Sequence, residues 1–209
     1  MFQLFVKGGP VMWPLLITSI TALTVVINRI FFLVRERSRR DPALVGEILA
    51  SVEQGNIDFA ISRADGTEDF VARVLRYGLA HRNRSFTNAL LAAANQELGR
   101  YNQGIAVLDT IITLAPLLGL LGTVTGMIHA FSLLGGRELG SPAAITGGIA
   151  EALIATAFGL FIAIVALIPF NYLNSKLEEA RREIEDASTH LELLLVKPAL
   201  SHENSFTKI

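Results

Sequence analysis

Three long apolar blocks, separated by polar stretches, dominate the pattern of the chain. They cover residues 11–34, 105–134 and 145–173. Each block exceeds the roughly 20 apolar residues with which a helix crosses the hydrocarbon core of a bilayer. The pattern therefore predicts an all-α membrane protein with three transmembrane helices.

The polar stretches predict further helices on one side of the membrane. Residues 35–104 carry helical apolar spacing, and Asp41 followed by Pro42 is typical of a helix start. We expect this stretch to form a cytoplasmic helical domain. Over residues 174–197 apolar residues recur every three or four positions, which predicts that the third helix continues into the cytoplasm. A helix lying on the membrane surface is the alternative.

Shorter segments complete the predicted organisation. Residues 1–10 are expected to form an interfacial segment, which Gly8, Gly9 and Pro10 break from the first span. Nothing in this segment resembles a cleavage site, so the first span is expected to remain in the mature protein. Residues 135–144 are expected to form an external loop, and residues 198–209 a flexible tail.

Basic residues predict how the spans are oriented. Arg35, Arg37 and two further arginines directly follow the first block, and Lys176 and Arg181 follow the third. Lys and Arg next to a span mark its cytoplasmic end. The N-terminus is therefore expected on the external side and the C-terminus in the cytoplasm.

Composition excludes several kinds of function. The chain is 51% hydrophobic with a net charge of −1, so no basic surface is expected to recruit nucleic acid. It has no cysteine and its four histidines are scattered, and we expect no metal site and no cofactor. The glycine-rich run 119–126 lacks the Lys-Ser/Thr ending of a phosphate-binding loop. No nucleophile arrangement appears either, so an enzyme is not expected.

One carboxylate lies inside the third block. Glu151 is followed by more than 20 largely apolar residues, and an acid within a span costs about 2.5–3.5 kcal/mol on insertion scales. Acids kept at that cost commonly move ions or hold a partner. The alternative is a position in the headgroup layer, favoured by the positive end of the helix.

Small residues line one side of the second and third blocks. On an ideal helix Gly119, Gly122 and Gly126 share a side, and Gly148 and Gly159 share another with several alanines. Such seams let membrane helices pack closely. Pro116 predicts a kink in the second span.

Two threonines flank the small residues. Thr123 lies beside Gly119 and Gly126, and Thr156 lies at the edge of the third-span seam, about 140° around the helix from Glu151. Each hydroxyl can serve an ion pathway or simply bond a carbonyl of its own helix. The pattern leaves both readings open.

Two motifs carry a family resemblance. Residues 114–131 read LAPLLGLLGTVTGMIHAF and residues 147–160 read GGIAEALIATAFGL, and they closely resemble the ExbB/TolQ/MotA family of ion-driven motor subunits, most of all ExbB and TolQ. The resemblance implies a ring of five copies around two copies of an ExbD/TolR-type single-span partner with an intramembrane aspartate. It also implies that Thr123, Thr156 and Glu151 belong to the ion pathway.

The expected function follows from that resemblance. It implies an inner-membrane subunit of a motor driven by the proton-motive force, in contact with membrane lipid. The N-terminus and the loop 135–144 would then lie in the periplasm. The motor would act on a periplasmic or outer-membrane process, TonB-type import or Tol-Pal envelope maintenance, through a TonB- or TolA-type force transducer. The alternatives are a self-sufficient homo-oligomeric ion channel, in which Glu151 sets selectivity, and a scaffold without ion flow. Dependence on a second chain distinguishes the motor from the channel.

Overall fold

The described part of the chain is helical. The computed structural model describes residues 5, 7–132 and 142–203, which hold α-helices joined by short turns and no strand. The helices are α2 (Met12–Ser38), α3 (Pro42–Glu53), α4 (Ile57–Arg63), α5 (Phe70–Ala80), α6 (Arg82–Asn102), α7 (Ile105–Ser132) and α8 (Pro142–Glu203). The predicted all-α fold class is confirmed. Most of the predicted periplasmic loop and the end of the predicted tail lie outside the described residues.

The chain folds into two compact units. The first, called here the apolar unit, consists of Met1–Ile30 and Gly104–Leu173. The second, the charged unit, consists of Phe31–Gln103 and Asn174–Ile209. Helices α2 and α8 each contribute their first part to the apolar unit and their last part to the charged unit.

Three helices are long and apolar enough to cross a membrane. They are Met12–Ser38, Ile105–Ser132 and the stretch Thr146–Leu195 of α8. In the most apolar stretch of α2 only 6% of the residues are buried, against 33% in α7. In water that exposure would be costly, whereas lipid tails are as apolar as these side chains. A bilayer around α2 therefore accounts for its outward-facing apolar residues.

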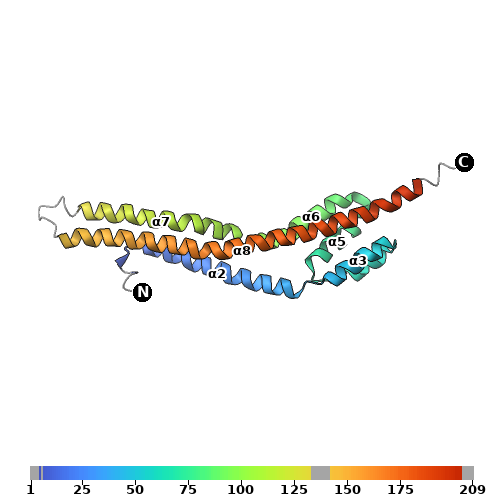
Figure 1. The fold of residues 1–209 in the computed structure, drawn as a ribbon, viewed down its shortest axis with the longest axis horizontal. Coiled ribbons are helices and arrows are strands. Elements are labelled where there is room, and N and C mark those ends of the chain that lie inside the picture. The colour runs from blue at the N-terminus through green and yellow to red at the C-terminus, as the bar shows by residue number, and fades with distance from the viewer. Residues whose placement is uncertain (1–4, 6, 133–141, 204–209) are drawn as a thin grey trace. The chain divides into compact units, whose positions relative to one another are not determined.

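In the apolar unit, α2 packs against the other two helices near its start. Val11, Met12 and Leu15 form a buried cluster with Ala115 of α7, and Phe158 and Ile162 of α8 pack against it. Figure 1 shows α2 (blue) and α7 (yellow-green) lying along the first part of α8 (orange). These contacts set the N-terminal turn of the chain beside α8.

The charged unit has its own apolar core. Ile48 of α3 and Val74, Leu75 and Leu79 of α5 are fully buried, as is Leu191 of α8. Helix α3 begins as the sequence predicts, with Pro42 in its first turn and the Asp41 side chain accepting a 3.1 Å hydrogen bond from the backbone N–H of Leu44. Helix α6 is interrupted at Ser85, whose φ of −166° and ψ of 87° are not helical.

A fully buried carboxylate joins several segments of the charged unit. Asp69 caps α5 by accepting a 2.9 Å hydrogen bond from the backbone N–H of Ala72, and it accepts a 2.7 Å bond from the backbone N–H of Asp41. It also pairs with Arg40, which bonds Glu183 of α8 at 2.7 Å. Because a buried charge is stable only when paired and hydrogen-bonded, Asp69 makes the start of α5 and the segment after α2 depend on each other.

A second charge cluster links α2 to α5 and α6. Arg73 donates two hydrogen bonds to Glu97, at 2.9 and 2.7 Å, and one at 3.4 Å to Glu36, whose side chain is 4% exposed. Arg100 bonds Glu97 at 2.8 Å. Burial alone would raise the pKa of Glu97, but the hydrogen bonds and charges of Arg73 and Arg100 outweigh it and hold that pKa below its ordinary value.

Replacing Asp69 should destabilise the charged unit. Asp69→Ala leaves Arg40 and two backbone N–H groups without their shared acceptor, and we expect a loss of about 3–5 kcal/mol because one partner of a buried ion pair is removed. Denaturant unfolding of the detergent-solubilised protein, followed by circular dichroism, measures the change. Asp65→Ala is the control, since Asp65 pairs with Arg76 with 69% of its side chain exposed and should cost no more than about 1 kcal/mol. Equal losses in the two variants would contradict this account.

Candidate functional site

Helices α7 and α8 touch along their small residues. The buried positions of α7 in the apolar unit include Ala115, Gly119, Gly122, Gly126 and Ala130. A Cβ added at Gly122 would lie 2.4 Å from the Cβ of Ala155, and one added at Gly126 would lie 2.9 Å from the Cβ of Ala152. No side chain larger than hydrogen fits at these positions unless the helices move apart.

The α8 side of the contact is equally tight. A Cβ at Gly148 would lie 2.9 Å from the Cβ of Ala130, and one at Gly159 would lie 2.5 Å from the carbonyl oxygen of Ala115. That carbonyl directly precedes Pro116, through which α7 continues as one helix. The contact at Gly159 is made to backbone, so rotating a side chain cannot relieve it.

Thr156 bonds across the helix contact. Its hydroxyl donates a 2.8 Å hydrogen bond to the backbone carbonyl of Gly119 on α7. In a regular helix that same carbonyl accepts the N–H of Thr123, four residues on. Of the two readings that the sequence left open for Thr156, a bond within its own helix is therefore not the one observed.

Thr123 behaves differently. Its hydroxyl donates to the carbonyl of Leu120 on its own helix at 2.6 Å. It is half-buried and follows Gly119 by one helical turn, about 6 Å along the axis. Thr156 is thus bonded between the two helices, whereas Thr123 is bonded within its own helix.

Glu151 has other neighbours. It is half-buried, and its carboxylate lies against the backbone of Gly9 in the N-terminal turn, where an added Cβ would be 1.8 Å from its Oε1 atom. Helix α8 begins at Pro142, so Glu151 lies about two and a half turns into the helix. The electrostatic effect of a helix N-terminus fades beyond the first turn. The helix dipole therefore contributes little to stabilising the Glu151 carboxylate at its position.

The structure thus bonds Thr156 to Gly119, one helical turn before Thr123, and it places the carboxylate of Glu151 against Gly9 of the N-terminal turn. Sequence analysis missed Gly9 as a neighbour of Glu151, because Gly8, Gly9 and Pro10 read only as a helix break. The one signal was a pair of glycines directly before a span. A glycine pair suggests that another part of the chain lies close to the backbone there, but it does not identify which residue.

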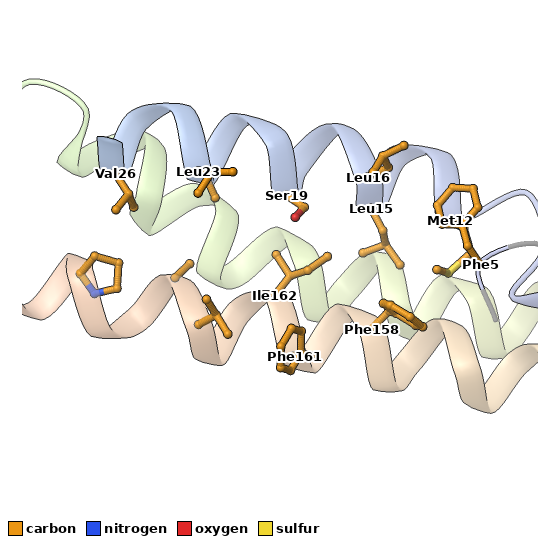
Figure 2. A pocket seen from close by; sticks show the side chains of 14 residues that line it. Phe5, Met12, Leu15, Leu16, Ser19, Leu23, Val26, Phe158, Phe161 and Ile162 are labelled. Carbon is orange, nitrogen blue, oxygen red and sulfur yellow. The ribbon is translucent and has the colours of Figure 1, made fainter. Parts of the chain in front are cut away.

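A pocket of about 320 Å³ lies between α2 and α8 in the apolar unit. Figure 2 shows Leu15 and Leu23 of α2 opposite Phe158 and Ile162 of α8, with Phe5 near one end. The hydroxyl of Ser19 is the one polar side-chain group among its lining residues. Such a lining favours apolar groups, such as hydrocarbon chains, and it offers no side chain for acid–base chemistry. Among the described residues, no three His, Cys, Asp or Glu side chains are grouped so that they could hold a metal ion.

Comparison with known proteins defines the class to which this architecture belongs. Residues 66–186 match the MotA/TolQ/ExbB proton channel family. The matched range contains Thr123, Glu151 and Thr156, together with all of the α7–α8 contact described above. The chain belongs to this family.

Individual relatives narrow the class. The chain is 39% identical to the ExbB-like 1 protein of Synechocystis over 197 residues, which cover 91% of this chain and 77% of that protein. It is 33% identical to the ExbB-like 3 protein of the same organism, covering 90% of this chain and 91% of the relative. The Tol-Pal system protein TolQ of Haemophilus influenzae is 38% identical over 95 residues, covering 46% of this chain and 42% of TolQ.

These findings confirm the family resemblance seen in the sequence. The chain is a stator-like proton-channel subunit of the ExbB/TolQ type, with three helices suited to a bacterial inner membrane. The family is one of transport proteins, not of enzymes.

Adding a methyl group to the α7–α8 contact should weaken the protein. Gly159→Ala forces a methyl toward the Ala115 carbonyl, and we expect a cost of about 1–3 kcal/mol, as for other overpacked sites. Heating the detergent-solubilised protein and following its size-exclusion peak measures the change. Gly147→Ala is the control, because a Cβ there meets nothing within 4 Å and alanine favours a helix. The close contact is contradicted if Gly159→Ala resists heat as well as Gly147→Ala does.

Removing the Thr156 hydroxyl should lower the stability of the protein by less than the Gly159→Ala substitution does. Thr156→Val deletes the bond to Gly119 while keeping the shape of the side chain, and hydrogen bonds between membrane helices contribute about 0.6–2 kcal/mol. The same heating assay measures this loss, and Thr156→Ser should retain most of the stability. The matched control is Thr125→Val, which removes bonds made only within α7. A loss in Thr125→Val as large as that in Thr156→Val would argue against an inter-helix bond.

Proposed function

We propose that this chain is the ring-forming subunit of a motor driven by the proton-motive force. Five copies surround the single spans of two copies of an ExbD/TolR-type partner that carries an intramembrane aspartate. The N-terminus lies in the periplasm and the charged unit in the cytoplasm. Proton flow through the assembly drives mechanical work on a periplasmic or outer-membrane process, TonB-type import or Tol-Pal maintenance, through a TonB- or TolA-type transducer.

The observation that carries this proposal is the hydrogen bond of Thr156 across the α7–α8 contact. It joins a hydroxyl and a carbonyl within a close contact between small apolar residues, and Thr123 follows Gly119 by one helical turn. All of these residues fall inside the range matched to the proton channel family. Polar groups within a span are costly and commonly mark ion routes, which supports a role for both threonines on the proton path.

The chemistry of these groups supports a partner. A hydroxyl can pass or solvate a proton, but it does not titrate near neutral pH, so the pathway needs a carboxylate that stores the proton between steps. Glu151 contacts the N-terminal turn, and it lies about 140° around α8 from Thr156 on an ideal helix. A carboxylate supplied by a second chain, opposite Thr123 and Thr156, meets this need.

The energy available fits small mechanical steps. One proton crossing a potential of 100 mV releases about 2.3 kcal/mol, about four times the thermal energy. That amount is comparable to the cost of repacking one tight helix contact. Each proton can therefore drive a step between two packed arrangements, provided that crossing and repacking are coupled.

Reconstitution tests the proposal. The chain is extracted gently from its native membrane, its composition is measured by native mass spectrometry, and proton uptake by liposomes that contain the complex is followed with a pH-sensitive dye. We expect five copies with two of a single-span, aspartate-bearing chain, and flux only when that chain is present. If the Thr156 hydroxyl lowers the barrier by about 1.4 kcal/mol, Thr156→Val reduces flux about ten-fold, while Thr156→Ser retains it.

Two results would overturn the motor. Flux through a ring that contains this chain alone would favour the self-sufficient channel, with Glu151→Gln then changing its selectivity. A stable complex whose flux ignores Thr156→Val, Thr123→Val and the partner's aspartate would favour a scaffold. Thr125→Val serves as the control in both cases, since its hydroxyl bonds only within α7.

A further inference from the structure

The side chain of Glu151 ends on the backbone of a residue 142 positions earlier in the chain. A Cβ at Gly9 would lie 1.8 Å from Oε1, 2.7 Å from Cδ and 3.1 Å from Cγ of Glu151. The carboxylate therefore occupies the space that any side chain at position 9 would take. Gly9 also has a φ of +74°, which side chains other than glycine rarely adopt. Position 9 thus demands glycine for two independent reasons.

The turn that contains Gly9 is held firmly in place. The N–H of Gly8 bonds the carbonyl of Phe5 at 3.2 Å, and the N–H of Met12 bonds the carbonyl of Gly9 at 3.2 Å. The ring of Phe5 meets that of Trp13 edge-on, with centroids 5.5 Å apart. These contacts close the turn upon the start of α2.

The same turn is seated on α8 beside Glu151. A Cβ at Gly8 would lie 3.1 Å from Cγ2 of Ile154, less than one helical turn from Glu151, and 2.6 Å from both Cγ and Sδ of Met12. Met12 is only 2% exposed, so it cannot easily make room. The two glycines therefore let the backbone lie flat on the α8 face that carries the carboxylate.

We propose that the turn Gly8-Gly9-Pro10 is a cap on Glu151, and that Gly9 positions the carboxylate and limits access to it from the side of the membrane that holds the N-terminus. A Cα–H···O contact with Gly9 contributes little energy. The effect of the cap is steric, because the backbone of Gly9 covers one side of the Glu151 side chain. Gly9 is a positioning residue, and it acts on ion flow only through Glu151.

Chemical labelling of Glu151 tests the cap without any assay of flux. A lipophilic carbodiimide adds to a protonated carboxyl group in an apolar setting and rearranges to a stable N-acylurea with no leaving group, and mass spectrometry of the peptide containing residue 151 gives the rate. In Gly9→Ala the methyl must displace either the turn or the carboxylate. We expect labelling about five-fold faster or more, because the uncovered state gains population.

Two other glycines control for backbone strain. Gly55 and Gly66 have φ values of +79° and +69°, but a Cβ at either would meet nothing within 4 Å. Gly55→Ala and Gly66→Ala therefore impose a similar strain with no contact to Glu151, and both should leave its labelling rate as in the unmodified protein. The cap is overturned if Gly9→Ala labels no faster than these controls.

Phe5→Ala provides a second variant in case Gly9→Ala does not accumulate in the membrane. It loosens the turn by removing the ring contact with Trp13 and adds no atom beside Glu151. Faster labelling of Glu151 supports the cap. An unchanged rate in a folded Phe5→Ala protein counts against it.

A second, conservative substitution at Glu151 tests whether Gly9 acts through that residue. Glu151→Asp shortens the side chain by one carbon, which withdraws the carboxylate from the space of a methyl group at position 9. This readout rests on the proposed function, because it measures proton flux of the complex with its partner. We expect Gly9→Ala and Glu151→Asp each to lower flux, and the double variant to recover part of it. The positioning role of Gly9 would be overturned if the flux of the double variant equalled the product of the fractional fluxes of the two single variants.

The two proposals can fail separately. Faster labelling in Gly9→Ala, together with no proton flux in any complex, would support the cap and overturn the motor. Flux that depends on the threonine pair and the partner, together with labelling that ignores Gly9, would support the motor and overturn the cap.

Discussion

The close contact between α7 and α8 is the constraint on which the apolar unit depends. Where a Cβ at Gly122 or Gly159 would lie about 2.5 Å or less from the facing helix, the two backbones touch, and dispersion forces act over many atom pairs at short range. In a bilayer the hydrophobic effect does not hold helices together, so this shape match has to supply much of the attraction. It also brings the Thr156 hydroxyl within bonding distance of the Gly119 carbonyl. A wider spacing would leave that hydroxyl to its own helix.

Two polar side chains of α8 have different neighbours. Thr156 faces α7, whereas Glu151, about 140° around an ideal helix, meets the turn before α2. In the two proposals, the threonine of the proton path and the capped carboxylate therefore lie on different sides of one helix. This separation is why the storage carboxylate of the proposed motor is sought in a second chain, and why the cap on Glu151 is best read as control of access.

The charged unit is stabilised by other interactions than the close helix contact of the apolar unit. Its helices share an apolar core, and buried carboxylates at Asp69 and Glu36 tie together segments that are distant in sequence. Because each buried charge needs its arginine, the end of α2, the start of α5 and one face of α8 cannot shift independently.

The sequence alone determined the helical class, the three membrane-length segments, the small-residue faces and the family, because each of these is written in local periodicity, length or a continuous motif. It also marked Thr123, Thr156 and Glu151, since polar residues stand out within apolar blocks. It could not choose between the two bonding modes of a threonine, because the choice depends on how close another helix comes: Thr123 bonds its own helix and Thr156 bonds its neighbour. Nor could it pair Gly9 with Glu151 or Asp69 with Arg40. Those contacts join distant positions, and only the packing of the folded chain decides which distant groups meet.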